Sequence, residues 1–234
     1  MWDSAGASMA TAKSDTLPCV IDQNDYKGLP FWDSGMEHRG QSGYIDTFTI
    51  GLSKLRIIHQ TAKFDGIVEV NKNGTWCKVL VFDDLANNND YDRTKDLNRD
   101  GYNDLIFQRK WSGDVHFFDP AKGYFSPDVN CEIGEDWHEL DSTAAIYYEV
   151  NTYNLTRPVI SKLFLIKKNA RVELANLTLT FDPNDEDYNI NKAALHYANS
   201  NHTEEIKLPQ KASVTSFDYK GFWNEKQKSI VVNP

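Results

Sequence analysis

The sequence predicts an all-β protein. Short runs rich in β-branched and aromatic residues recur along the chain, and clusters of Asn, Asp, Gly and Pro separate them. Runs of this kind, bounded by turn residues, are typical of strands joined by tight turns. Amphipathic helical patterns are scarce, and the best candidate is a short helical turn near Trp223–Lys228. The 234 residues, 40 % of them hydrophobic, suffice for one large β-domain or two small ones.

The expected strands follow one another at short intervals. Tyr44–Ile50 alternates apolar and polar residues, which indicates a strand with one buried face. The other expected strands are short and rich in β-branched or aromatic residues: Leu55–Ile58, Ile67–Val70, Trp76–Phe82, Leu105–Phe107, Val115–Phe118, Ala144–Val150, Leu163–Ile166 and Val172–Phe181.

Five strand–turn–strand units repeat loosely along the chain. Each has a Lys-containing turn followed by aromatic or β-branched residues. The turn residues are Gly28, Gly74, Gly123, Ala170 and Gly221, at spacings of 46, 49, 47 and 51 residues. Propeller blades repeat at about 40–50 residues. We therefore expect a propeller-like arrangement of about five units. A β-sandwich or two small β-domains is the alternative, because hairpin turns are common in any β-protein.

The first 18 residues differ from the rest of the chain. Residues 1–18 are small and polar and lack the apolar stretch of a secretion signal. We expect residues 1–18 to form a flexible N-terminal segment and residues 19–234 to form a single all-β domain. No run of about 18 apolar residues occurs, so no transmembrane segment is expected.

The net charge of the chain limits the kinds of molecule that it is expected to bind. The chain has 34 acidic and 25 basic residues and a formal net charge of −9. This balance argues against a general nucleic-acid binder, because attraction to phosphates requires a basic face. It fits a protein that binds cations or a basic partner.

Three cysteines, Cys19, Cys77 and Cys131, are too few for a scaffold built on disulfides. They allow one disulfide, which would indicate an oxidising compartment, and leave at least one free thiol. Leu17-Pro18-Cys19 faintly resembles a lipid-attachment sequence, although no apolar region precedes it.

The most specific motif is a nine-residue loop that predicts a calcium site. The side chains of Asp96, Asn98 and Asp100 alternate along the loop, and Asp104 closes it. The Tyr102 carbonyl is expected to point inward between them. Calcium takes six to eight oxygen ligands, which a short loop can supply only if the backbone turns sharply. Gly101 allows that turn because glycine adopts positive φ without strain. The predicted ligands of Ca²⁺ are therefore Asp96, Asn98, Asp100, Tyr102 and Asp104.

The residues after this loop separate two classes of calcium protein. An EF-hand requires a Glu at the twelfth loop position and a following helix. Here the twelfth position is Phe107, and Leu105–Phe107 has the composition of a buried strand. The loop therefore leads directly into a strand.

The stretch Asp96–Phe107 resembles the calcium loops of FG-GAP/VCBS-type repeats, in which D-x-[DN]-x-D-G-x-x-D precedes an apolar strand. Val115–Phe125 is similar to the following stretch in a group of bacterial extracytoplasmic β-propeller-like proteins, where a strand ends in an Asp-Pro turn. That group includes inhibitors of peptidoglycan-cleaving enzymes. The resemblance implies a calcium-stabilised fold outside the cytoplasm, but no inhibitory residue transfers to this sequence.

These observations lead to two hypotheses about function. The first is a non-catalytic, calcium-stabilised binding or inhibitor-type module, periplasmic or at the cell surface, directed at a cell-wall-degrading enzyme. Its partner would be a protein or a surface glycan. The alternative is a glycan-active enzyme or a carbohydrate-binding surface protein, because carboxylates are abundant and aromatic residues reach 12 %. No zinc-ligand spacing, phosphate loop or nucleophile elbow occurs, so no catalytic residue is predicted.

Overall fold

A computed structural model describes residues 31–32, 44–60, 65–83, 91–108, 112–127, 131–134, 136–152, 155–198, 200, 202–209 and 211–231. Within these ranges the chain forms seventeen strands and one helix, which confirms the all-β prediction. The expected flexible segment at residues 1–18 and the expected turn at Gly28 lie outside the described residues.

The described strands form four sheets. The five-stranded sheet contains β1 (Phe31–Trp32), β2 (Tyr44–Ile50), β3 (Ser53–Gln60), β4 (Asp65–Lys72) and β5 (Thr75–Asp83) in that order. The four-stranded sheet has the order β11 (Cys131–Gly134), β8 (Ser112–His116), β7 (Leu105–Gln108) and β6 (Tyr91–Asp92). Strands β9 (Phe118–Asp119) and β10 (Tyr124–Phe125) form a two-stranded sheet.

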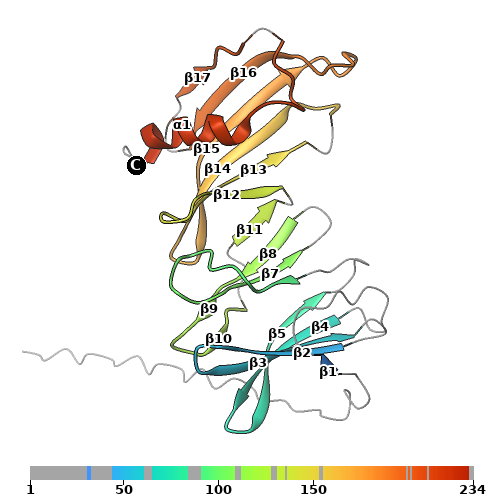
Figure 1. Ribbon diagram of the computed structural model, residues 1–234, viewed down its shortest axis with the longest axis vertical. Helices are drawn as coiled ribbons and strands as arrows, with labels where there is room; N and C mark the ends of the chain where they lie inside the picture. Colours follow the sequence, from blue (N-terminus) through green and yellow to red (C-terminus); the bar gives the residue numbers. More distant parts are fainter. Residues whose placement is uncertain are drawn as a thin grey trace, which may run out of the picture.

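The six-stranded sheet also follows the order of the chain. It contains β12 (Trp137–Asp141), β13 (Ile146–Asn151), β14 (Val159–Lys167), β15 (Ala170–Phe181), β16 (Ile190–Tyr197) and β17 (Thr203–Glu205), and the helix α1 spans Tyr219–Val231. The four sheets succeed one another along an elongated molecule, from β1–β5 at one end to β12–β17 and α1 at the other (Figure 1). No closed barrel forms among the described strands, so this arrangement fits the β-sandwich alternative. The propeller-like arrangement stays a prediction.

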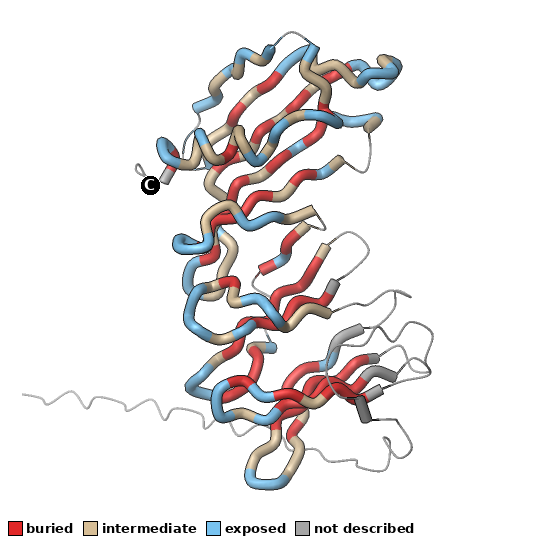
Figure 2. Tube along the Cα trace, viewed as in Figure 1, coloured by how far each residue is buried: buried red, intermediate tan, exposed pale blue. Residues whose placement is uncertain are grey.

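Buried residues are concentrated along the strands of the successive sheets (Figure 2), and they form clusters that join one sheet to the next. One cluster joins the five-stranded sheet to β7, β9 and β10, and it includes Leu55 and Phe118. A second joins the four-stranded sheet to β13 and β14 through Ile106 and Phe164. A third lies between the six-stranded sheet and α1, around Trp223. Since β7 contributes to the first two clusters, both of its faces are buried.

Two of the predicted turns close tight hairpins. Asn73 and Gly74, between β4 and β5, have φ values of +53° and +88°. Lys168 and Asn169, between β14 and β15, have φ values of +52° and +59°. Two consecutive residues with positive φ are typical of the hairpin turn whose twist matches that of the flanking strands.

The prediction of a fifth strand–turn–strand unit at Gly221 is wrong. Tyr219, Lys220 and Gly221 form the first turn of α1 instead. The Asp218 carboxylate accepts a hydrogen bond from the Gly221 N–H at 2.8 Å, and this contact caps the helix. The predicted helical turn at Trp223–Lys228 lies inside α1 and is confirmed. Its fully buried Trp223 donates a hydrogen bond from Nε1 to Ser161 Oγ on β14 at 2.8 Å.

The two cysteines of the described region differ in state. Cys77 in β5 is disulfide-bonded, and Cys131 in β11 is a buried free thiol. Burial raises the pKa of the Cys131 thiol to about 12, so this thiol is neutral and unreactive at ordinary pH. In the described part of the chain, no helix has the length and apolar character needed to cross a membrane.

Candidate calcium site

The loop Asp96–Asp104 connects β6 to β7 and folds tightly on its own backbone. Asp96 Oδ2 accepts a hydrogen bond from the Gly101 N–H at 2.9 Å. Asn98 Oδ1 and Asp100 Oδ1 accept hydrogen bonds from backbone N–H groups two residues further on, at 3.1 Å and 2.9 Å. Gly101 has the expected positive φ, at +90°. The alternating side chains therefore bend back along the turn, as a short metal-binding loop requires.

Asp104 lies beneath the loop and is fully buried. Its Oδ2 accepts a hydrogen bond from the Leu97 N–H at 2.8 Å, and its Oδ1 accepts one from the Phe118 N–H at 3.1 Å. Burial raises the pKa of Asp104 to about 7; the two backbone N–H groups oppose this rise, and the charges of Asp100 and Asp96 add to it. The structure therefore brings three of the predicted ligands within electrostatic reach of one another, with Asp104 in an anchoring position.

The residues of the loop fit a calcium ion by their chemistry. All the side-chain groups that they offer are hard oxygens, which calcium prefers. A carboxylate oxygen that accepts one hydrogen bond keeps a lone pair for a cation. A divalent cation would also relieve the mutual repulsion of the three carboxylates. The described residues contain no cluster of three or more His, Cys, Asp or Glu side chains arranged as a preformed metal centre. Closure around an ion would therefore have to draw Asp96, Asn98 and Asp100 inward.

The Tyr102 side chain takes part in packing, which leaves its carbonyl as the predicted ligand. Its ring lies 5.4 Å from the ring of Phe118 in β9. It also covers Gly51, in the turn between β2 and β3, where an added Cβ would lie 3.1 Å from the Tyr102 ring. The loop thus contacts both the five-stranded and the two-stranded sheet.

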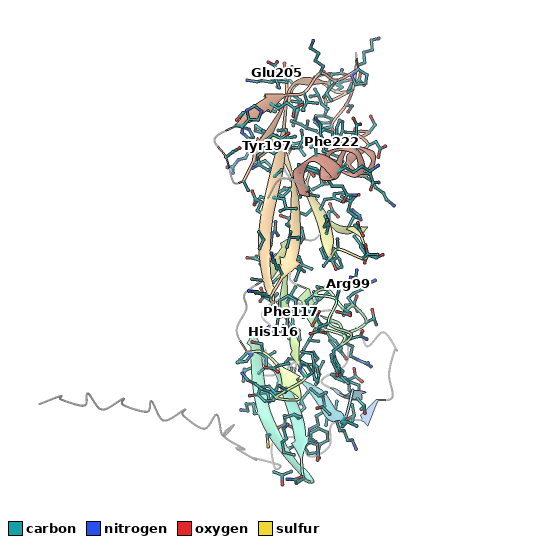
Figure 3. All side chains as sticks on the ribbon, turned by 90° about the vertical axis from the view of Figure 1, so that its left-hand side faces the viewer. Arg99, His116, Phe117, Tyr197, Glu205 and Phe222 are labelled. Carbon is teal, nitrogen blue, oxygen red and sulfur yellow. The ribbon has the colours of Figure 1, made fainter. Side chains whose placement is uncertain are left out.

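Three further contacts tie the loop to the six-stranded sheet. The Tyr147 hydroxyl on β13 donates a hydrogen bond to the Leu97 carbonyl at 3.0 Å. Asn98 Nδ2 donates one to Asn169 Oδ1 at 2.7 Å. Arg99, labelled near the middle of the molecule in Figure 3, forms an ion pair with Glu139 on β12 at 2.8 Å.

Sequence reasoning missed these contacts, because their partners lie 40 to 71 residues away along the chain. The loop runs into β7 of the four-stranded sheet, and Tyr102 contacts the five-stranded and two-stranded sheets. With the contacts to the six-stranded sheet, the loop is therefore connected to all four sheets. Only Asn169 could have been singled out from the sequence, because it occupies a predicted hairpin turn, where a polar side chain is exposed to other segments. Nothing in the local sequence pointed to Glu139 or Tyr147 as partners of the loop.

Comparisons with known proteins leave the family open. No family model matches the chain, and no curated protein matches it. A solved structure described as a Xanthomonas type IV secretion system related protein is similar at 16 % identity, covering 75 % of this chain and 97 % of that chain, with a TM-score of 0.40. A likeness of this degree carries no argument about function. The resemblance to FG-GAP/VCBS-type repeats therefore stays a prediction.

Proposed function

We propose that this chain is a non-catalytic, extracytoplasmic binding module whose sheets are held together by one calcium ion in the loop Asp96–Asp104. The observation that supports this proposal best is the position of the loop, which contacts all four sheets. An ion bound there would stiffen a segment that contacts all four sheets. Its proposed role is structural, because the loop that would hold it contacts the sheets through Tyr102, Leu97 and Asn98.

The ligands would be the side chains of Asp96, Asn98, Asp100 and Asp104 and the carbonyl of Tyr102. Asp104 would hold the loop from below and complete the negative charge around the ion. Extracellular calcium modules have Kd values of about 10⁻⁴–10⁻³ M. Binding in that range would keep the site filled outside the cell, where calcium is abundant, and leave it empty inside.

The disulfide at Cys77 supports the proposed compartment, because structural disulfides persist in oxidising environments. The motif resemblance of Asp96–Phe107 and Val115–Phe125 favours an inhibitor-type role directed at a cell-wall-degrading enzyme. The same resemblance supports a propeller-like arrangement of the units around Gly74, Gly123 and Ala170. In the turn before Gly123, Asp119 Oδ1 accepts hydrogen bonds from the N–H groups of Ala121 and Lys122, which supports this part of the proposal.

Calcium is expected to raise the melting temperature of the protein. A hundredfold excess of calcium over its Kd adds about 2.7 kcal/mol of stability, which is about 5–10 °C for a chain of this size. Asp100→Ala should remove most of that shift. Thermal unfolding in calcium and in chelator checks both results. Asp182→Ala is the matched control, because Asp182 also caps a surface turn but lies outside the loop. Equal melting temperatures of the unaltered protein in calcium and in chelator would refute the calcium proposal.

The inhibitory role is tested separately against a panel of lysozymes and other peptidoglycan hydrolases. We expect inhibition of at least one enzyme and no turnover of peptidoglycan or other glycans by the protein itself. Hydrolysis of a glycan would instead support the glycan-active enzyme.

A further inference from the structure

Three consecutive residues of the calcium loop bond to three different parts of the six-stranded sheet. Leu97 accepts a hydrogen bond from β13, Asn98 donates one to the turn between β14 and β15, and Arg99 pairs with β12. The long hairpin of β14 and β15 reaches from its sheet toward this loop (Figure 1). Of the three residues, only Asn98 is also a predicted ligand of calcium. The Asn98 amide is therefore a group that the proposed ion and the six-stranded sheet would share.

Three hydrogen bonds fix the orientation of the Asn98 amide. Its Oδ1 accepts the Asp100 N–H at 3.1 Å, so Oδ1 faces the backbone of the turn. Its Nδ2 donates to Asp100 Oδ2 at 2.9 Å and to Asn169 Oδ1 at 2.7 Å. An amide nitrogen has two hydrogens, and both are used here. A rotated amide would face the Asp100 N–H with another N–H group and the Asp100 carboxylate with an oxygen, so only the observed orientation satisfies all three contacts.

Asn169 presents its acceptor from a rigid turn. Lys168 and Asn169 have φ values of +52° and +59°, a region that Asn adopts more readily than most residues other than glycine. The turn joins strands of 9 and 12 residues, and the Lys167–Ala170 pair closes their ladder directly beside it. The backbone that carries Asn169 is thus fixed relative to the six-stranded sheet.

An ion and Asn169 would engage opposite ends of the Asn98 amide. The ion would bind the lone pairs of Oδ1, whereas Asn169 accepts a hydrogen bond from Nδ2. A cation at Oδ1 draws electron density from the nitrogen and makes its N–H a stronger donor, so the two bonds reinforce each other. Movement of Asn98 toward an ion is also passed on to the hairpin through this bond. An Asp at this position would offer no donor to Asn169 Oδ1.

We propose that Asn169 is a positioning residue of the calcium site. It holds the Asn98 amide with Oδ1 turned toward the interior of the loop, and it couples calcium binding to the attachment of the six-stranded sheet. The inference rests on the proposed calcium site and adds to it a residue that lies 71 positions away from Asn98 along the chain. Asn169 acts through Asn98 and is not itself a ligand.

Asn169→Gly is expected to raise the Kd for calcium about tenfold, because loss of a group that orients a metal ligand typically costs about 10–100-fold in affinity. The substitution removes the acceptor but leaves the turn unstrained, since glycine adopts positive φ readily. Asn169→Asp keeps an acceptor, and its Kd should stay within about threefold of that of the unaltered protein in high salt, where the added charge is screened. Titration of the backbone amide signals of the full-length protein with calcium chloride measures each Kd.

Asn73→Gly is the matched control. Asn73 also occupies a two-residue hairpin turn, between β4 and β5, with a φ of +53°. Among the described residues no hydrogen bond joins it to the loop, so its substitution should leave the Kd unchanged. Thermal unfolding in chelator first establishes that all three variants are folded. A purely structural role of Asn169 would lower the melting temperature in chelator and leave the Kd for calcium unchanged, so the Kd separates positioning from stabilisation.

Amide exchange supplies a second readout, because coupling between two sites acts equally in both directions. Calcium should slow exchange at Lys167 and Ala170 in the unaltered protein, and this slowing should disappear in Asn169→Gly. Equal Kd values for the unaltered protein and Asn169→Gly, or tighter binding by the variant, would overturn the inference and leave the calcium proposal intact. Absence of calcium binding to the unaltered protein would overturn both.

Discussion

Replacing Asp104 with Ala is expected to lower the free energy of unfolding by about 4 kcal/mol, even in the absence of calcium. The Asp104 carboxylate is fully buried and accepts hydrogen bonds from the N–H groups of Leu97 and Phe118. Without it, both N–H groups lose their acceptor at a buried site, and each such loss costs about 1–3 kcal/mol. The hydrogen bond from the Phe118 N–H in β9 to the loop would be lost as well.

Urea unfolding in the presence of a chelator measures this effect without any contribution from the ion. Asp100→Ala is the control in the same loop, because Asp100 is exposed. In chelator it should cost less than about 1 kcal/mol. In calcium both variants should lack the stabilisation that the unaltered protein gains. Equal costs of the two variants in chelator would contradict the anchoring role of Asp104.

Glu149→Gln is expected to cost about 3 kcal/mol, because it leaves the Arg171 guanidinium without its counterion. Two hydrogen bonds, at 2.8 Å and 2.7 Å, join Arg171 to the Glu149 carboxylate. Glu149 also accepts a hydrogen bond from the Gly134 N–H at 2.7 Å, and Arg171 donates one to the Glu132 carbonyl at 2.8 Å. These contacts connect β11 of one sheet with β13 and β15 of the next. The control is Glu173→Gln, since the Lys162–Glu173 pair is more exposed than the Glu149–Arg171 pair and should be worth at most about 1 kcal/mol.

The ion pair between Glu149 and Arg171 also predicts how the stability of the protein depends on pH. Burial alone would raise the pKa of Glu149, but the hydrogen bonds and charge of Arg171, the Gly134 N–H and the charge of Lys162 together hold the pKa below the ordinary value of 4.5. A carboxyl with a lowered folded-state pKa stabilises the protein above its unfolded-state pKa. That stabilisation is lost as pH falls through the folded-state pKa. Acid unfolding should therefore reduce the advantage of the unaltered protein over Glu149→Gln below about pH 4.5. An advantage that stays constant down to pH 2 would contradict this assignment.

Local patterns in the sequence predicted most of the strands and the sharp turns. Tyr44–Ile50 matches β2, because strict alternation of polar and apolar residues reports directly on a half-buried strand. Gly74 and Gly101 were correctly predicted to lie in sharp turns, because a turn with positive φ favours glycine over almost every other residue. Gly221 misled the prediction, since a Lys-Gly pair also suits the first turn of a helix once Asp218 caps it.

The sequence could predict the identity of the loop residues but not the surroundings of the loop. Asp104 was expected to close the loop as a ligand, and this stays a prediction; the sequence did not show that both of its oxygens accept hydrogen bonds from backbone N–H groups. Its partner at Phe118 and the contact between Asn98 and Asn169 depend on how the sheets pack. Contacts between distant segments leave no periodic signal in a single sequence, so only the fold shows them.

The succession of strands has a consequence for how the chain folds. In the six-stranded sheet every strand is hydrogen-bonded to its neighbour in the sequence, and β1–β5 follow the same rule. Ladders of this kind close only short stretches of chain and therefore lose little loop-closure entropy. The bond from Tyr147 to Leu97 spans 50 residues, and the bond from Asn98 to Asn169 spans 71. We therefore expect each meander to assemble early by local pairing and the long-range contacts of the loop at residues 97–104 to form late, which residue-by-residue refolding kinetics of loop variants would check.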